Sequence, residues 1–315
     1  MRALHVPAAG AEIQLGEVPN PEVTEGTVLV RVKAAGLNAV DNALAAGMMA
    51  EMMPHEYPLV VGRDAAGVVE AVGEGVEGIA VGDEVLGHVL MAPPIQAGTI
   101  AEYAVLPAAA VVAKPAGLDF VTAAAIPLAG AAAAQAVDAV DPQAGQTVLV
   151  NGADGGVGSY AVQLLAARGV TVIATGKPDS AERLRSLGAT TVIDHHTTDV
   201  AEQVRAAHPD GVDALVNVGG FDPTAVPLHA VRSGGKLSTT TVEPDADTLS
   251  AAGVTSTMIM ARPLREVVGP LVEQAAAGKL EVSVAEVLPF DQAADGLARL
   301  AAGKANGKLV VDIEA

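Results

Sequence analysis

The segment Thr147-Val148-Leu149-Val150-Asn151-Gly152-Ala153-Asp154-Gly155-Gly156-Val157-Gly158 joins an apolar run to a glycine-rich loop and is the strongest indication of the fold. Its apolar start predicts a short buried strand, and the residues that follow the glycines predict an amphipathic helix. Glycines between a strand and a helix let the backbone approach a pyrophosphate closely, and the N–H groups at the helix start favour its charge. The spacing is not a literal GxGxxG, so an ordinary tight turn is the alternative. The candidate cofactor-binding residues of this loop are Ala153, Gly155, Gly156 and Val157.

On the C-terminal side of this loop, strand-like and helical runs alternate. Such alternation is typical of a doubly wound parallel sheet, the Rossmann dinucleotide-binding fold. The place of the glycines, after the first strand of this series, favours nucleotide binding over an ordinary turn. The expected strands are 147–150, 170–175, 190–193, 213–218, 236–241 and 254–260, and the expected helices are 157–168, 180–187, 199–207 and 224–231.

On the N-terminal side, short β-rich runs are separated by glycine and proline, which indicates a β-rich, barrel-like domain with few helices. Half of the uncharged stretch 120–137 is alanine, and it contains Pro127, so we expect a closely packed soluble helix there and not a membrane span. The remaining expected elements are strands 27–32, 66–72, 83–89 and 100–105, a helical run after about 262, strand 286–289, helix 292–301 and strand 308–313.

Length and composition narrow the function further. The 315 residues predict two domains at about 150 residues per domain. A net charge of −19 disfavours nucleic acid and membrane surfaces as partners. The absence of cysteine excludes disulfides, thiolate zinc sites and cysteine nucleophiles, and it suits the cytosol. The start of the chain predicts a strand and not a signal peptide. We therefore expect a cytoplasmic protein that acts on a small molecule.

The region after the second expected strand bears on the choice of coenzyme. NAD sites place a carboxylate at the end of this strand, where it would repel the 2′-phosphate of NADP. Here the second expected strand ends with Ala174-Thr175, and the first acidic residue after it is Asp179. The sequence therefore predicts NADPH. The alternative is that Lys177 and His195 are solvated loop residues. Charge-assisted hydrogen bonds to the 2′-phosphate could come from Thr175, Lys177 and Ser180. His195, at the end of the third expected strand, could form another wall of the same pocket.

Six segments resemble the medium-chain dehydrogenase/reductase superfamily and, within it, the zinc-independent quinone oxidoreductases. They are AGLNAVD at 35–41, VGRDAAGVV at 61–69, VGDEV at 81–85, AEYAV at 101–105, GGVG at 155–158 and NGKLV at 306–310. The resemblance implies a GroES-like catalytic domain formed by 1–117 and 262–315, and an NADP-binding Rossmann domain at 118–261. It also implies a substrate cleft between them and homodimers joined through the sixth strand.

The zinc alcohol dehydrogenases of this superfamily bind their metal through a cysteine and a His-Glu pair. This chain has Asn38 at the first position and Arg63-Asp64 at the second. An arginine does not ligate zinc, and the chain has no thiolate. We therefore expect no metal and a direct hydride transfer from the nicotinamide to a carbon conjugated with a carbonyl group. We expect Arg63 and Asp64 to form a salt bridge that stabilises their loop.

The resemblance also suggests three catalytic residues. It implies that Asn38 contacts the nicotinamide ribose region and the substrate, and that Asp41 is the matching acid three residues on. An Asx turn at the end of a strand is the alternative for both. Tyr57 lies near the place where some relatives carry a proton donor, or it is a packing residue. Two polar positions of many relatives are Ala43 and Ala132 here, which leaves protonation to solvent or to another side chain.

The substrate class follows from the apolar composition. Four of the eight methionines lie within 48–53, where they would either wrap an apolar substrate or pack a helical turn onto the barrel. Aromatic residues make up only 2% of the chain, which favours an alkyl enone or an enoyl group over a flat quinone. The leading hypothesis is an NADPH-dependent reductase of quinones or α,β-unsaturated carbonyls. The alternatives are a 2-enoyl-thioester reductase and a non-catalytic NADPH-binding sensor or scaffold.

Overall fold

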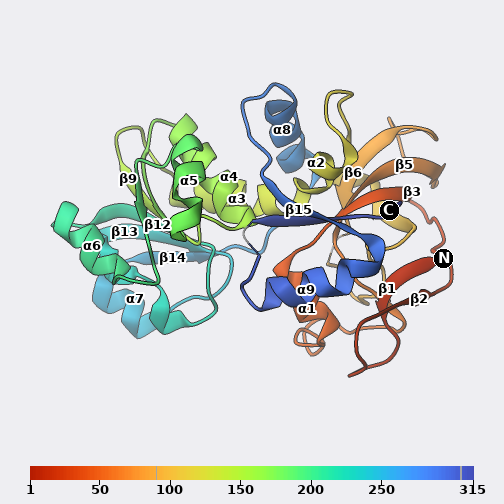
Figure 1. Ribbon diagram of the computed structural model, residues 1–315, viewed down its shortest axis with the longest axis horizontal. Helices are drawn as coiled ribbons and strands as arrows, with labels where there is room; N and C mark the ends of the chain where they lie inside the picture. The colour runs from red at the N-terminus through yellow and green to blue at the C-terminus, as the bar shows by residue number, and fades with distance from the viewer. Residues whose placement is uncertain (90, 306) are drawn as a thin grey trace. The chain divides into compact units, whose positions relative to one another are not determined.

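The computed structural model describes residues 1–89, 91–305 and 307–315, so Asn306 of the NGKLV segment lies outside the described residues. The chain forms two compact units. The first consists of Met1–Ala131 and Arg262–Ala315, and the second of Ala132–Ala261. Both ends of the chain therefore belong to the first unit (Figure 1).

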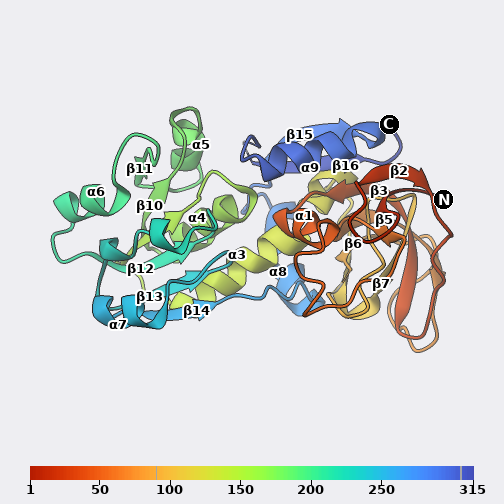
Figure 2. The ribbon, with the colours of Figure 1, turned by 90° about the horizontal axis from the view of Figure 1, so that it is seen from below.

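The second unit is built on a six-stranded parallel sheet with the order β11-β10-β9-β12-β13-β14. Figure 2 shows the strands labelled there, β11, β10, β12, β13 and β14, in this order from top to bottom. The central residues Val148, Leu149 and Val150 are fully buried, as expected for a parallel sheet covered on both faces. The elements are β9 Thr147–Asn151, α4 Gly156–Ala167, β10 Thr171–Thr175, α5 Ala181–Ser186, β11 Thr191–Ile193, α6 Val200–Ala207, β12 Val212–Asn217, β13 Val231–Thr239, α7 Ala246–Ala252 and β14 Thr255–Met258.

The sequence predicted all six of these strands and the helices α4, α5 and α6, so the doubly wound parallel sheet is confirmed. The predicted helix at 224–231 is wrong. Two short 3₁₀ turns, Pro223–Ala225 and Leu228–Ala230, take its place. Pro227 lies between them, and a proline inside a helix removes a hydrogen bond and clashes with the preceding turn.

Helix α7 was missed, although both of its ends carry ordinary signals. The side chain of Asp245 accepts a hydrogen bond from the N–H of Thr248 at 2.7 Å, and Gly253 ends the helix with φ +65°. Only seven residues separate these caps, which is too short for a clear helical period in the sequence.

The first unit contains a seven-stranded sheet and a three-stranded sheet. The path through the larger one is β15-β16-β3-β5-β6-β8, with β7 paired to β3, and the smaller one has the order β2-β1-β4. The elements are β1 Arg2–Val6, β2 Gln14–Glu17, β3 Thr27–Gly36, α1 Ala39–Ala45, β4 Leu59–Val60, β5 Asp64–Val72, β6 Glu84–His88, β7 Tyr103–Pro107, β8 Val111–Ala113, α2 Phe120–Ala124, α8 Arg265–Ala276, β15 Val284–Pro289, α9 Ala293–Ala301 and β16 Lys308–Asp312. Helix α3, Pro127–Val140, begins in this unit and continues into the second.

The alanine-rich stretch forms two helices, α2 and α3, where one was expected. Pro127 is the first residue of α3, a position at which its missing N–H costs no helical hydrogen bond. Among the described residues, the helices are too short or too polar to cross a bilayer.

The last strand of the first unit adds to the edge of the sheet formed by the early strands. β16 runs antiparallel to β3, with Val310 opposite Gly36 and Asp312 opposite Ala34. The helix α9 that precedes β16 lies beside α1 (Figure 1), where the side-chain amide of Asn42 donates to the carbonyl of Leu297 at 3.0 Å. The C-terminal segment therefore reaches the residues around Asn38 at the start of α1.

Candidate functional site

A cluster of buried polar side chains lies where four strands of the first unit meet. Each member is at most 9% exposed. Their positions follow from strand register, since Asp64 lies opposite both Gly36 and His88, and β16 pairs with β3 on its other side. The members of this cluster are Asn38, Asp64, His88 and Lys308.

Asp64 is the centre of the cluster. Its Oδ2 accepts hydrogen bonds from Asn38 Nδ2 at 3.0 Å and from Lys308 Nζ at 3.3 Å. Its Oδ1 accepts from His88 Nδ1 at 2.8 Å and from the backbone N–H of Leu128 at 3.1 Å. Burial alone would raise the pKa of Asp64, but the charge of Lys308 and the hydrogen bonds from His88 and Asn38 outweigh it, so the pKa lies below its ordinary value. Asp64 is therefore a carboxylate that four donors stabilise.

The amide of Asn38 has one orientation in this cluster. Its Nδ2 donates to Asp64 and to the carbonyl of Gly36 at 3.2 Å, and its Oδ1 accepts from Lys308 Nζ at 2.6 Å. A flipped amide would place its oxygen against two acceptors and its N–H₂ group against an ammonium. Gly36 leaves the space that Lys308 needs, because a Cβ there would lie 3.2 Å from Nζ and 2.4 Å from the carbonyl oxygen of Ala124.

His88 takes part as a neutral donor. Burial lowers its pKa, which outweighs the opposing effect of the hydrogen bond to Asp64. Because a carboxylate only accepts hydrogen bonds, the contact with Asp64 assigns the proton to Nδ1. Sequence analysis missed both His88 and the role of Lys308. The signal for Lys308 was a charged residue at the start of the apolar strand Lys308–Asp312.

The expected salt bridge between Arg63 and Asp64 is not present, and this expectation was wrong. Among the described residues, the ion pair of Asp64 is with Lys308. Arg63 lies in a bend just before β5, and its charge still acts on Asp41 and Asp64 without a direct ion pair. Its guanidinium Nη2 donates to the carbonyl of Ala97, and it is 1% exposed.

Asp41 lies next to the cluster and is fully buried. Its Oδ2 accepts from the backbone N–H of Asn38 at 2.7 Å, and the N–H of Asp41 donates to the carbonyl of Asn38, which caps the start of α1. Its Oδ1 has no hydrogen-bond partner among the described residues. Burial raises the pKa of Asp41 to about 7, although the charge of Arg63 opposes this. Asp41 is therefore a group whose charge changes near neutral pH.

Tyr57 lies on the loop before β4 and is half-buried against the core of the first unit. Its ring meets that of His55 edge-on, with centroids 6.4 Å apart. No described residue forms a hydrogen bond with its hydroxyl group. Of the three predicted catalytic residues, the structure brings Asn38 and Asp41 together, and Tyr57 contributes a hydroxyl without a protein partner.

The positions that match the ligands of zinc dehydrogenases do not fit a zinc ion. The side-chain oxygen of Asn38 accepts a hydrogen bond from the ammonium of Lys308. The carboxylate of Asp64 already accepts four hydrogen bonds. Arg63 contributes a guanidinium, which has donors only. Within the described ranges, no group of three or more histidine, aspartate or glutamate side chains could hold a metal ion.

The glycine loop forms the candidate site of the second unit. Gly152 has φ +84°, in the left-handed region that favours glycine. A Cβ on Gly158 would lie 2.2 Å from the carbonyl oxygen of Gly152 and 2.5 Å from Cα of Ala153, so only glycine allows this contact between helix and loop. Gly155 caps α4, and Gly156 and Val157 are its first residues. This backbone fits a pyrophosphate, which would bind at the N–H groups that begin α4.

The predicted 2′-phosphate ligands lie in different surroundings. Thr175 is fully buried, and its hydroxyl accepts from Gly152 N–H and donates to Asn151 Oδ1, both at 2.9 Å. Ser180 is 9% exposed and donates to the carbonyl of Lys177 at 2.7 Å. Both hydroxyls therefore brace the loops in this structure, and their contact with a phosphate stays a prediction.

Lys177 and His195 have more solvent around them. Lys177 is half-buried and His195 is exposed, with its ring centroid 4.2 Å from that of His196. Partial burial and the neighbouring His196 lower the pKa of His195. Sequence analysis missed Arg183, whose Nη2 donates to the backbone carbonyl of Asp154 at 3.0 Å.

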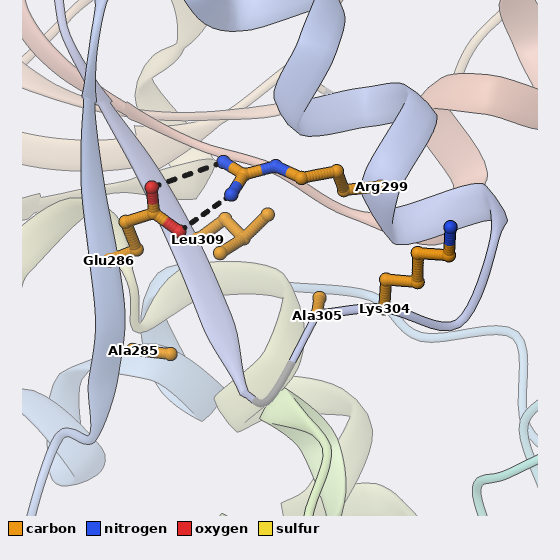
Figure 3. Close-up of a pocket in the computed structure, with 6 residues that line it drawn as sticks. All are labelled: Ala285, Glu286, Arg299, Lys304, Ala305 and Leu309. Atoms are coloured by element: carbon orange, nitrogen blue, oxygen red, sulfur yellow. Dashed lines mark hydrogen bonds and ion pairs between the residues drawn. The ribbon is translucent and has the colours of Figure 1, made fainter.

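Pockets among the described residues include one in each unit. One, of about 160 Å³, lies between β15, the end of α9 and β16 (Figure 3). There the guanidinium of Arg299 binds both carboxylate oxygens of Glu286, while the side chain of Lys304 points away from this pair. The pocket is smaller than the several hundred Å³ of typical ligand sites. The other, of about 430 Å³, lies in the second unit between the turn at Pro223–Ala225 and the loop before α7.

The chain is similar to known protein families and to individual relatives. Residues 24–116 match the alcohol dehydrogenase GroES-like domain, and residues 187–311 match a zinc-binding dehydrogenase family. A chloroplast envelope quinone oxidoreductase homolog of Arabidopsis thaliana is 31% identical over 97% of this chain and 94% of its own length. An NADPH-dependent alkenal/one oxidoreductase of the same plant is 32% identical over 92% of this chain and 73% of its own length.

Solved structures of dehydrogenases and related proteins superpose on nearly the whole chain. An NAD-dependent alcohol dehydrogenase superposes with a TM-score of 0.88 at 31% identity, over 99% of this chain and all of that one. A mycobacterial protein in complex with NADPH superposes with a TM-score of 0.87 at 27% identity, again over 99% of this chain and all of that one. Relatives that use either coenzyme therefore share this fold.

Proposed function

Because this chain belongs to the medium-chain dehydrogenase/reductase superfamily, with quinone oxidoreductases and enone reductases as its relatives, we propose that it is an NADPH-dependent reductase of quinones or α,β-unsaturated carbonyl compounds. The observation that carries the proposal is the contact between Gly158 and Gly152. It keeps the start of α4 open to a pyrophosphate, as the fold requires of a dinucleotide site. Relatives named for NADPH, and a similar structure that contains it, support the choice of coenzyme.

We assign the catalytic role to 1–117 and 262–315 and the binding of NADPH to 118–261. When bound, the reduced nicotinamide supplies a hydride. Ala153, Gly155, Gly156 and Val157 would hold the pyrophosphate through the backbone, and Thr175, Lys177, Ser180 and His195 would lie toward the adenosine 2′-phosphate.

The reaction we propose needs no zinc. Lys308 and Asp64 fix the amide of Asn38 where a metal ligand would otherwise be, and the donors of this cluster leave no carboxylate oxygen without a partner. Asn38 then presents a rigid backbone and side chain to the nicotinamide ribose and the substrate, which limits the orientations of both.

Tyr57 is the residue we propose as proton donor. Reduction of an enone places a negative charge on the carbonyl side of the product, which a proton must neutralise. The hydroxyl of Tyr57 has no hydrogen-bond partner among the described residues, whereas Asp41 is fully buried. Tyr57→Phe should therefore lower turnover by roughly a hundredfold or more, as expected for loss of a general acid, and leave the affinity for NADPH unchanged.

The experiment for the whole proposal mixes the protein with NADPH and, in turn, a quinone, an alkyl enone and an enoyl thioester. Oxidation of NADPH with the quinone or the enone supports it, and preference for the thioester would assign the chain to the enoyl-thioester reductases. Calorimetric binding of NADPH without oxidation by any acceptor would indicate a sensor or scaffold. We also propose a cytoplasmic homodimer, consistent with the lack of cysteine, which light scattering on the purified protein would test for its oligomeric part.

A further inference from the structure

The glycine loop of the second unit contains an acidic residue, Asp154, whose side chain contacts the loop after β10. These two loops would hold the phosphates of a coenzyme. We propose that the Asp154 carboxylate weakens the preference for a 2′-phosphorylated coenzyme, so that the protein accepts NADH alongside NADPH. This inference rests on the proposed function, and it concerns the selectivity of the nucleotide site.

The position of Asp154 follows from two hydrogen bonds. Its Oδ2 accepts from the backbone N–H of Lys177 at 3.1 Å, which ties the carboxylate to the loop after β10. Its own backbone carbonyl accepts from Arg183 Nη2 at 3.0 Å. A Cβ added to Gly176 would lie 3.5 Å from Cβ of Asp154, so the side chain packs directly against this loop.

The loop that Asp154 contacts is the one whose residues set coenzyme choice in this fold. An acid at the end of the second strand binds the ribose hydroxyls of NAD and repels the 2′-phosphate of NADP. The segment that follows β10 has no acidic residue before Asp179, and this pattern predicted NADPH. The structure supplies the carboxylate from the preceding loop, across a hydrogen bond to the residue that follows Gly176.

Basic groups around the carboxylate keep a phosphorylated coenzyme acceptable. The charges of Lys177 and Asp154 both affect the pKa of His195, so these three side chains lie near one another. The guanidinium of Arg183 donates to the backbone carbonyl of Asp154. Asp194 also acts on His195. Among these basic side chains, the Asp154 carboxylate reduces the attraction for a phosphate dianion without reversing it. The arrangement thus suits a site with modest selectivity between the two coenzymes.

The test measures binding of two adenine nucleotides that lack the nicotinamide. Adenosine 5′-monophosphate and adenosine 2′,5′-bisphosphate differ only in the 2′-phosphate, and calorimetry gives the affinity of each for the full chain. Asp154→Asn removes the charge and keeps an oxygen to accept from Lys177 N–H. We expect the ratio of affinities, bisphosphate over monophosphate, to rise roughly tenfold in Asp154→Asn, and this gain to shrink in about 1 M salt.

Asp179→Asn is the matched control, because it removes the same charge from an exposed residue two positions beyond Lys177. The ratio for this control should stay within roughly twofold of that of the natural chain. Asp154→Ser gives a second variant without the charge. If the natural chain binds both nucleotides but neither Asp154 variant changes the ratio more than Asp179→Asn does, the inference about Asp154 is wrong. If neither nucleotide binds to any of these folded chains, the proposed function itself fails.

Discussion

The ammonium of Lys308 lies 2.6 Å from the side-chain oxygen of Asn38, although the two residues are 270 positions apart in the chain. The same ammonium lies 3.3 Å from Asp64 Oδ2. The last strand of the chain thus completes a buried cluster that begins at the first helix. Neither end of the chain could form this cluster alone.

Lys308→Met should destabilise the protein strongly. The substitution leaves the carboxylate of Asp64 buried without its ammonium partner, and breaking such a buried pair typically costs about 3–5 kcal/mol. Denaturant unfolding measures the loss. Lys236→Met is the control, because its ion pair with Asp141 spans 3.7 Å between exposed side chains and should contribute at most about 1 kcal/mol. Equal effects of the two substitutions would contradict the role of Lys308.

Asp41 predicts a particular dependence of stability on pH. Its pKa is about 7 in the folded chain, above the value near 3.9 expected in the unfolded chain. The folded state therefore holds this proton more tightly, and the contribution to stability is present at acid pH and is lost as the pH rises toward 7. Between about pH 5 and about pH 8, Asp41→Asn should lose roughly 2–3 kcal/mol less stability than the natural chain. Identical pH dependence of the two chains in denaturant unfolding would show that Asp41 does not titrate there.

His88 should remain neutral at about pH 6, where an ordinary histidine is mostly protonated. Its proton lies on Nδ1 because the hydrogen bond at 2.8 Å goes to the Asp64 carboxylate. Nitrogen NMR of the imidazole rings checks both points. The expected spectrum has one ring with a protonated Nδ1 and an unprotonated Nε2 that does not change between about pH 8 and about pH 6. A His88 ring that titrates in this range would disprove the assignment.

Gly158→Ala should weaken nucleotide binding with a smaller effect on the fold. The new methyl group would lie 2.2 Å from the carbonyl oxygen of Gly152, so the loop must move away from α4. We expect NADPH to bind at least roughly tenfold more weakly, since the N–H groups no longer converge on the pyrophosphate. Gly269→Ala, where nothing lies within 4 Å of the added Cβ, should bind NADPH as the natural chain does. Unchanged binding by Gly158→Ala would mean that the coenzyme does not use this loop.

Much of the fold could be predicted because the strands of the second unit are short, apolar and bounded by glycine. The helix expected at 224–231 failed because Pro227 interrupts a stretch whose composition otherwise suits a helix. Helix α7 escaped notice because its seven residues show no clear period.

The candidate sites were predictable only in part, and the reason is sequence distance. Asn38 and the glycine loop have local signals, but the distant partners that orient the Asn38 amide come from β5 and β16. Arg63 donates to the carbonyl of Ala97 and Asp64 pairs with Lys308, and neither partner is near them in sequence. Asp154 was present in the quoted segment, yet its link to Lys177 joins two loops that only the fold brings together.

The most direct test of a metal-free hydride transfer uses NADPH that carries deuterium at the transferable position of the nicotinamide. The protein, freed of metal by a chelator, is incubated with this NADPH and an alkyl enone, and the product is analysed by mass spectrometry. We expect one deuterium on the carbon β to the carbonyl group. A product that forms without deuterium at this carbon, or only after zinc is added back, would contradict it.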